Sequence, residues 1–195
     1  TADPWGPGGI LKGEKTFKFF EKYVGDTKIE DLKIPFSAVA TDLLNGKTVV
    51  IKSGSLASAL RSSSSVPVLY APVIEEGKIL VDGAVTVPIP VEIVKNMGAD
   101  IVIAVNLYTN QFPMKITKKH KKEINGRQVM RISQQLILNK LAEESAKNAD
   151  VIIRPRIIEK SFCVLTNLVK EKGTIRVGEE AAQKEIENIK KLLIS

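Results

Sequence analysis

The sequence predicts a mixed α/β fold in which short apolar strands alternate with helices. The clearest evidence lies in the middle of the chain, where a strand-like run at 78–81 precedes a helix-like segment at 91–96 and an apolar run at 101–105. A continuous apolar run without polar alternation is typical of a strand buried on both faces of a parallel sheet. Strand–helix–strand order therefore predicts helices layered on a partly parallel sheet.

The length and composition are those of an ordinary globular domain. The chain has 195 residues, of which 44% are hydrophobic and 26% are charged. A domain usually has ~100–200 residues, and this composition differs from that of disordered chains. No apolar run approaches the ~18 residues that a membrane span needs. The Gly- and Pro-rich stretch at 1–8 reads as a loop or as a remnant of truncation, and the ordered domain is expected from residue 9 onward.

The first half of the chain predicts a helix followed by a β-hairpin. Aromatic and apolar residues at helical spacing predict a helix over 16–24, which Gly25 ends. Strand-like runs at 34–40 and 48–51 flank an Asn-Gly dipeptide at 45–46, which is a strong hairpin signal. The same rules predict a short helix at 56–62 capped by Ser55, and they predict that Gly98 closes the helix at 91–96.

Three further elements are expected in the second half of the chain. A long amphipathic helix should follow residue 127, with one stripe formed by Met130, Gln134, Ile137, Leu141 and Ala142. A strand at 151–153 and a helix at 179–193 should come after it.

The charge and the cysteine count limit the classes of partner and site. A net charge of +7 favours anionic partners, either nucleic acid or acidic lipid. Nucleic acid is not expected, because aromatic residues make up only 5% of the chain and none lies within the lysine run at 118–122. A single cysteine, Cys163, excludes an internal disulfide and a multi-cysteine metal site. We expect no cofactor and no metal.

The one histidine is a poor candidate for a general base. His120 lies within Lys118–Lys122, where neighbouring ammonium groups disfavour its protonation and offer no acceptor to orient the ring. A Ser–His–Asp triad within this chain is therefore not expected.

Asp82 is the candidate catalytic residue. It ends the short strand-like run at 78–81 and is followed by two small residues, Gly83 and Ala84, which permit close approach of a substrate. Alone, this pattern would indicate only a turn, since Asp-Gly is a common turn dipeptide.

The motifs on either side of Asp82 favour a functional role over a simple turn. A serine-rich segment that closes on a proline lies upstream at 60–67, and Pro-x-Pro and Gly-Ala-Asp segments lie downstream at 88–91 and 98–105. In this order the motifs resemble the second half of patatin-like phospholipases, and the resemblance extends from about residue 9 to the segments at 149–155 and 178–182. It implies a three-layer α/β/α patatin-like fold, with residues 9–195 forming the C-terminal part of a single domain.

The resemblance also implies roles for particular residues. By position Asp82 matches the catalytic aspartate of the family, and Gly83 and Ala84 match its small partners. Ser63 and Pro67 match residues with a packing or supporting role. The family's nucleophile lies in Gly-x-Ser-x-Gly, a pattern that this sequence lacks, and its Gly-rich oxyanion loop is also missing from the expected place.

The function implied is that of a lipid acyl hydrolase, a phospholipase or esterase with a Ser–Asp dyad, in which this chain supplies the aspartate and lacks the serine. The fragment alone is then expected to be inactive. Its expected partners are a lipid or ester substrate and a second copy of the chain, through a sheet edge or face left uncovered. No secretory signal is visible, so a cytoplasmic location is expected, with peripheral membrane contact.

Two other classes stay open at this point. A basic module that binds anionic membrane or nucleic acid would explain the charge but not the motif around Asp82. A catalytically inactive patatin homologue would keep the fold without a nucleophile.

Overall fold

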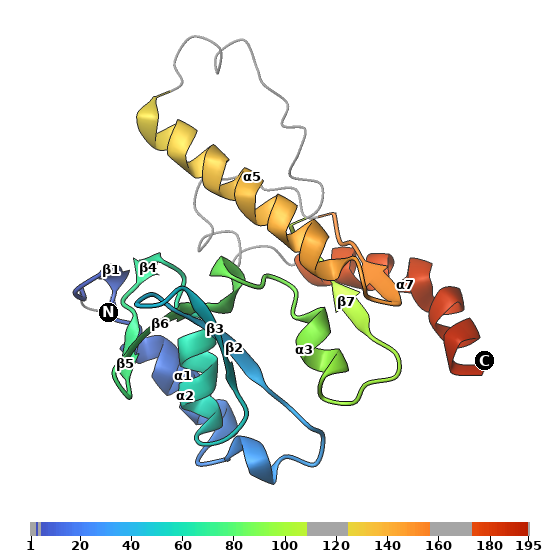
Figure 1. The fold of residues 1–195 in the computed structure, drawn as a ribbon, viewed down its shortest axis with the longest axis horizontal. Coiled ribbons are helices and arrows are strands. Elements are labelled where there is room, and N and C mark those ends of the chain that lie inside the picture. Colours follow the sequence, from blue (N-terminus) through green and yellow to red (C-terminus); the bar gives the residue numbers. More distant parts are fainter. Residues whose placement is uncertain (1–2, 4, 109–124, 157–172, 195) are drawn as a thin grey trace. The chain divides into compact units, whose positions relative to one another are not determined.

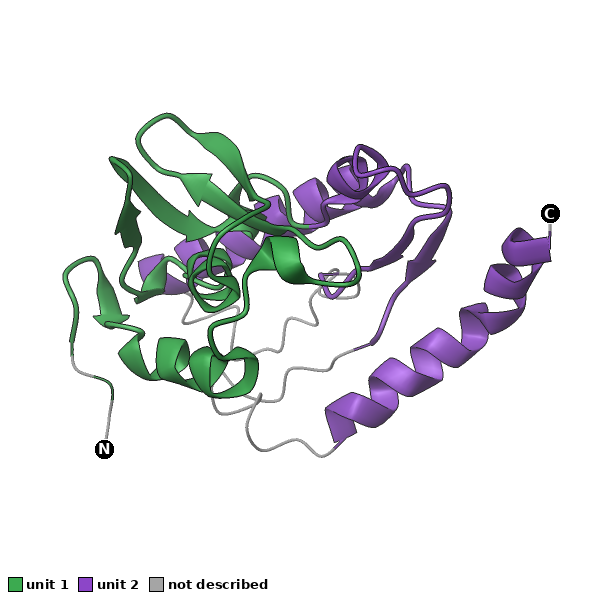
Figure 2. Cartoon of the chain, turned by 90° about the horizontal axis from the view of Figure 1, so that it is seen from below, with its two compact units in different colours: residues 1–88 green, residues 89–195 purple. Residues whose placement is uncertain are grey.

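The computed structural model describes residue 3 and residues 5–108, 125–156 and 173–194 (Figure 1). The chain divides into two compact units, residues 1–88 and residues 89–195 (Figure 2). His120, the lysine run at 118–122 and Cys163 lie outside the described residues.

The first unit is built on an antiparallel four-stranded sheet with the order β3-β2-β6-β5. Its strands are β2 (Ala38–Asp42), β3 (Lys47–Ile51), β5 (Val73–Glu75) and β6 (Lys78–Asp82). All five residues of β2 are buried, which makes it the central strand of the core. A separate parallel pair joins β1 (Gly9–Leu11) to β4 (Val68–Tyr70).

The hairpin predicted around Asn45 and Gly46 is confirmed, since β2 and β3 pair along their whole length. The Asn45 side chain accepts a hydrogen bond from the main-chain N–H of Lys47 at 2.8 Å, and Gly46 has a positive φ of 68°. The first strand begins at residue 38, whereas the sequence pattern placed its start at 34. Pro35 lacks the N–H that strand pairing requires, and Ile34 is exposed.

Two helices and two 3₁₀ turns complete the first unit: α1 (Glu14–Val24), η1 (Ile29–Asp31), α2 (Leu56–Ser63) and η2 (Gly83–Val85). The predicted cap is present, because the Ser55 hydroxyl accepts from the N–H of Ser58 at 3.3 Å. One face of α2 packs against η1 and β2 in a cluster formed by Ile29, Ala38, Leu56 and Ala59.

Arg61 on α2 is buried although it carries a charge, with only 6% of its surface exposed. Its Nη2 donates to the carbonyl oxygens of Lys12 at 2.7 Å and Ala71 at 2.9 Å. Its Nε donates to the carbonyl oxygen of Gly13 at 3.2 Å, and its Nη1 donates to the Ser65 hydroxyl. The guanidinium thus joins the chain before α1, the end of α2 and the connection between β4 and β5.

The turn at Gly13 fits closely around this guanidinium. A Cβ atom at Gly13 would lie 2.2 Å from Nη2 of Arg61, and Gly13 has a φ of 82°. The Tyr70 ring lies on the guanidinium, with its centroid 5.4 Å from Cζ. Glycine is therefore required at position 13 both by the backbone conformation and by the available space.

The second unit contains α3 (Val91–Lys95), β7 (Ile103–Val105), α5 (Gly126–Ala146), β8 (Val151–Ile153) and α7 (Gly173–Ile194). Strands β7 and β8 are parallel, as the continuous apolar run predicted. Their pairing is extended by Asp150, whose carboxylate accepts from the N–H of Val102 at 2.8 Å.

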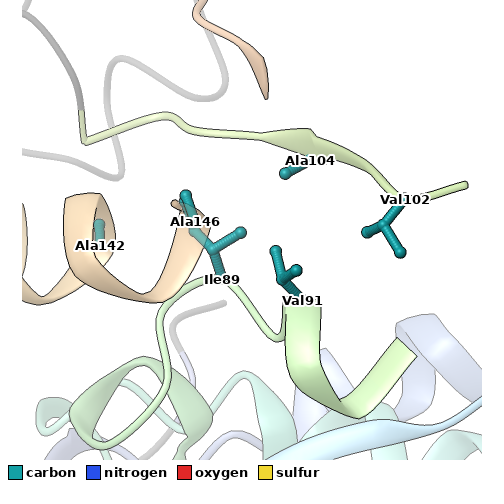
Figure 3. Packing of buried hydrophobic residues seen from close by; sticks show 6 residues of the cluster. All are labelled: Ile89, Val91, Val102, Ala104, Ala142 and Ala146. Atoms are coloured by element: carbon teal, nitrogen blue, oxygen red, sulfur yellow. The ribbon is translucent and has the colours of Figure 1, made fainter. Parts of the chain in front are cut away.

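The core of the second unit lies where α5 meets α3 and β7. Figure 3 shows its six buried residues, Ile89, Val91, Val102, Ala104, Ala142 and Ala146. The stripe predicted along α5 is wrong for Met130 and Ile137, which are 66% and 65% exposed. The buried residues of α5 are the two alanines near its C-terminal end, because small side chains there allow the helix to approach the core closely.

The predicted mixed α/β class is confirmed by these elements. The extent of the domain over residues 9–195 stays a prediction. None of the described helices combines the length and the apolar character needed to cross a bilayer.

The buried guanidinium generates a prediction about stability. We expect Arg61→Lys to lower the free energy of unfolding of the first unit by about 2–4 kcal/mol, because an ammonium cannot reproduce the planar, four-bond geometry and leaves buried carbonyl groups without a donor. A urea titration read from the amide NMR signals of β2 measures this change. Arg176→Lys is the matched control, since Arg176 is exposed on α7 and pairs with Glu180 one turn along the same helix. Equal effects of the two substitutions would show that the Arg61 network does not stabilise the fold.

Candidate active site around Asp82

Asp82 is the last residue of β6, at the point where the chain leaves the sheet and enters η2. Its register partner on β2 is Ala40, and the next partners are Val81 and Thr41. The side chain is half-buried. The strand end predicted from the sequence is therefore present, and the carboxylate lies at the boundary between the apolar core and solvent.

The carboxylate of Asp82 is held by the turn that follows it. Its Oδ1 accepts a hydrogen bond from the main-chain N–H of Ala84 at 2.8 Å. Burial raises the pKa of the Asp82 carboxyl above its ordinary value because the charged form loses hydration, and the N–H of Ala84 opposes this rise. A carboxylate in such a place is a stronger base than one in water.

Gly83 is required by close packing of the turn on β2. The residue is buried, and a Cβ atom there would lie 2.4 Å from the main-chain oxygen of Val39. Any side chain at this position would push the turn away from β2 and move Asp82 with it. Ala84 contributes its N–H, and its small side chain is half-buried.

The main chain of Asp82 is fixed from two sides. Its N–H donates to the carbonyl oxygen of Ser65 at 3.0 Å, and its carbonyl oxygen accepts from the Thr41 hydroxyl at 3.1 Å. Ser65 and Thr41 are both buried. Because Arg61 binds the Ser65 hydroxyl, the buried cation and the candidate base belong to one hydrogen-bond network.

The residues predicted to support Asp82 are placed differently from one another. Ser63 is half-buried in the last turn of α2, and Pro67 is exposed between α2 and β4. It is Ser65, in the same serine run, whose carbonyl contacts Asp82. Sequence reasoning missed Ser65 and Thr41. The available signal was a polar residue within the otherwise apolar strand at 38–41, where only a bonded side chain can be buried without a large cost.

The site offers a carboxylate base but no donor set for a metal. No group of three or more His, Cys, Asp or Glu side chains able to hold a metal ion occurs among the residues that the structure describes. Covalent chemistry at Asp82 would need a nucleophile within hydrogen-bond reach, about 2.6–3.2 Å.

Comparison with known proteins finds relatives of the segment that contains Asp82. The model of the patatin-like phospholipase family matches residues 1–95. An uncharacterized NTE family protein of Mycobacterium tuberculosis (strain ATCC 25618 / H37Rv) is 42% identical over 99 residues, which cover 51% of this chain and 28% of that protein. A putative patatin-like phospholipase domain-containing protein of Caenorhabditis elegans is 30% identical over 53% of this chain and 10% of that protein. The mouse patatin-like phospholipase domain-containing protein 7 is 33% identical over 84 residues, which cover 42% of this chain and 6% of that protein.

The chain thus spans 28% or less of the length of these relatives. The part of the resemblance that was predicted beyond residue 95 lies outside the family match. The matched segment includes the serine-rich end of α2, β6 and the turn at Asp82. Residues 1–95 of this chain, with Asp82 among them, match the model of the patatin-like phospholipase family.

Proposed function

We propose that this chain supplies the general base of a Ser–Asp dyad in a lipid acyl hydrolase, with Asp82 as that base. The observation that carries the proposal is the half-buried Asp82 carboxylate at the carboxyl end of β6, within a patatin-like segment. Its raised pKa brings the carboxylate closer to the basicity that proton transfer from a hydroxyl requires. The serine of the dyad would lie outside these 195 residues, because the sequence has no Gly-x-Ser-x-Gly.

The mechanism follows from the contacts of the carboxylate. The N–H of Ala84 binds Oδ1, so we assign proton acceptance to Oδ2. As Oδ2 takes the serine proton, the serine oxygen forms a bond to the acyl carbonyl carbon and the carbonyl becomes an oxyanion. Collapse breaks the ester bond, and Asp82 returns the proton to the leaving alcohol. Water then attacks the acyl-enzyme, with Asp82 again accepting and returning a proton, and the fatty acid leaves.

The role of Asp82 requires its orientation as well as its basicity. The tight packing of Gly83 on Val39 and the bond from Ala84 fix where the carboxylate points. An oriented base loses little entropy on reaching the transition state. The proposed steps use only a hydroxyl, a carboxylate and water, with oxyanion donors supplied by the same segment as the serine.

The proposed substrate is an acyl ester of a lipid, in line with the names of the relatives. The net charge of +7 supports peripheral contact with anionic lipid surfaces. Self-association is proposed as well, because Ile74 on the edge strand β5 is 76% exposed and apolar strand edges tend to pair with another chain.

The proposed dyad requires a serine nucleophile outside these residues. We expect the coding sequence upstream of Thr1 to encode Gly-x-Ser-x-Gly within about a hundred codons, and the protein that includes it to hydrolyse short-chain esters and to react with a serine-directed phosphonate. Asp82→Asn should fold normally, being nearly isosteric, and should lower kcat by ~10²–10⁴-fold because proton transfer from the serine is lost.

His120→Ala is the control in that longer protein and should leave kcat nearly unchanged. Loss of activity in His120→Ala with activity retained in Asp82→Asn would contradict a dyad based on Asp82. An upstream sequence without the motif would instead support an inactive homologue or a basic binding module, and the latter would show salt-dependent binding to anionic vesicles or nucleic acid.

The 195-residue chain alone should not hydrolyse ester or phospholipid substrates above the uncatalysed rate. Asp82 can accept a proton but cannot form the acyl intermediate, and a carboxylate without oxyanion donors stabilises no developing charge. A continuous assay with a chromogenic short-chain ester checks this expectation. Turnover by the chain that disappears in Asp82→Asn would show that the nucleophile lies within these residues.

The raised pKa of Asp82 predicts how stability depends on pH. A folded-state pKa above the unfolded value means that the protonated form is favoured on folding. This contribution is fully present below the unfolded pKa of ~3.9 and is lost as the pH rises through the folded pKa. Asp82→Asn carries no charge and keeps an oxygen for the N–H of Ala84. We therefore expect this variant to be more stable than the wild type at neutral pH, with the difference vanishing at and below pH ~3.9.

Urea denaturation at several pH values measures this difference, with Asp26→Asn, at an exposed residue of the same unit, as the control for loss of a surface charge. A deficit of stability in Asp82→Asn at neutral pH would show that the ionised form is the stabilised one.

A further inference from the structure

We infer that three threonine hydroxyls form a one-directional hydrogen-bond chain, from Thr48 through Thr86 to Thr41, that ends on the main-chain carbonyl of Asp82 and positions its carboxylate. The inference rests on the proposed function for the catalytic meaning of that position. Its structural part can be tested without any catalytic activity.

The three hydroxyls come from three elements of the first unit. Thr41 lies on β2 and Thr48 lies opposite it on β3, as register partners, and Thr86 follows η2 directly. The Oγ1 atom of Thr86 lies 2.9 Å from the Oγ1 atoms of both Thr41 and Thr48. Thr41 Oγ1 in turn lies 3.1 Å from the carbonyl oxygen of Asp82.

The direction of the hydrogen bonds follows from the single hydrogen that each threonine hydroxyl can donate. The carbonyl of Asp82 can only accept, so the single hydroxyl hydrogen of Thr41 points to it. Thr41 must then accept from Thr86, and Thr86 must accept from Thr48. The carbonyl of Gly83 is another acceptor for Thr86, but at 3.5 Å it is farther than Thr41 at 2.9 Å. All three hydroxyls are satisfied in this order.

Such an arrangement is more than ordinary strand pairing. Thr41 is 1% exposed within a buried strand, where a valine of the same shape would pack without any need for a partner. Hydrogen bonds in a chain polarise one another, so the last donor is strengthened by the two behind it. That last donor holds Asp82 at the residue where the chain turns into η2, and the same turn delivers the N–H of Ala84 to the carboxylate.

The test uses substitutions that remove single hydroxyl groups. Thr41→Val removes the terminal donor with little change of shape, and Thr41→Ser restores a hydroxyl. Thr86→Val interrupts the series of hydroxyl hydrogen bonds in the middle. It is the second variant should Thr41→Val fail to fold. Thr27→Val is the matched control, since the Thr27 hydroxyl also donates to a main-chain carbonyl, that of Val24, away from Asp82.

The first measurement is amide hydrogen exchange at Ala84 in the 195-residue chain. We expect exchange to be about fivefold to tenfold faster in Thr41→Val, the effect of losing one hydrogen bond, and at least twofold faster in Thr86→Val. Thr41→Ser and Thr27→Val should stay within twofold of the wild type, as should the N–H of Ala59 on α2 in every variant. Acceleration below twofold at Ala84 in the valine variants overturns the inference.

The second measurement is ester hydrolysis by the longer protein, with kcat expressed per phosphonate-labelled site so that unfolded molecules do not count. We expect Thr41→Val to lower kcat about tenfold with KM within twofold of the wild type, and Thr41→Ser to restore it. Full kcat in Thr41→Val overturns the positioning role and leaves the proposed function intact. Absence of hydrolysis in the wild type overturns the proposed function and with it any catalytic role of the three hydroxyls. The exchange data still decide whether the hydroxyls hold the turn at Asp82.

Discussion

The first unit depends on one buried cation. The guanidinium of Arg61 has lost its hydration, and a buried charge is tolerable only when its donors are satisfied. Four bonds to Lys12, Gly13, Ser65 and Ala71 meet that requirement. Because three of these acceptors are main-chain carbonyls from two separate segments, the chain before α1 and the connection between β4 and β5 must come to the end of α2. The network that satisfies Arg61 also orients Ser65, whose carbonyl holds the N–H of Asp82.

Asp82 presents a different case, a carboxylate whose charged form is disfavoured because burial removes part of its hydration. Arg61 is surrounded by acceptors, whereas the Asp82 carboxylate is half-buried and accepts a hydrogen bond from the N–H of Ala84. Burial raises its pKa, which makes the ionised form costly in the folded state and at the same time more basic. Local cost of this kind is common at functional sites, where the surrounding structure over-determines a group that would otherwise relax. The rigid supports of the Asp82 main chain are consistent with that interpretation.

Local sequence rules predicted the elements well and the network poorly. The hairpin at Asn45 and Gly46, the Ser55 cap and the strand that ends at Asp82 depend on neighbouring residues, so they could be predicted from short patterns. The bonds from Arg61 to Gly13 and from Thr41 to Asp82 join residues 48 and 41 positions apart, and no local pattern encodes such a pairing. The stripe on α5 was wrong because helical periodicity identifies an apolar face without showing how much of it a partner covers.

The surroundings of Asp82 also explain why a base could be preorganised apart from its nucleophile. The groups that fix its main chain and side chain, Thr41, Ser65 and Ala84, all belong to residues 1–88 and are held by the core of that unit. A dyad differs here from a triad, because it has no histidine that must be oriented between the acid and the hydroxyl. In the proposed dyad, a serine would need only to arrive within hydrogen-bond reach of a carboxylate whose direction is already set. The geometric demand on the segment that carries the proposed serine is then reduced to one distance and one angle, which would suit a site assembled from two separate stretches of chain.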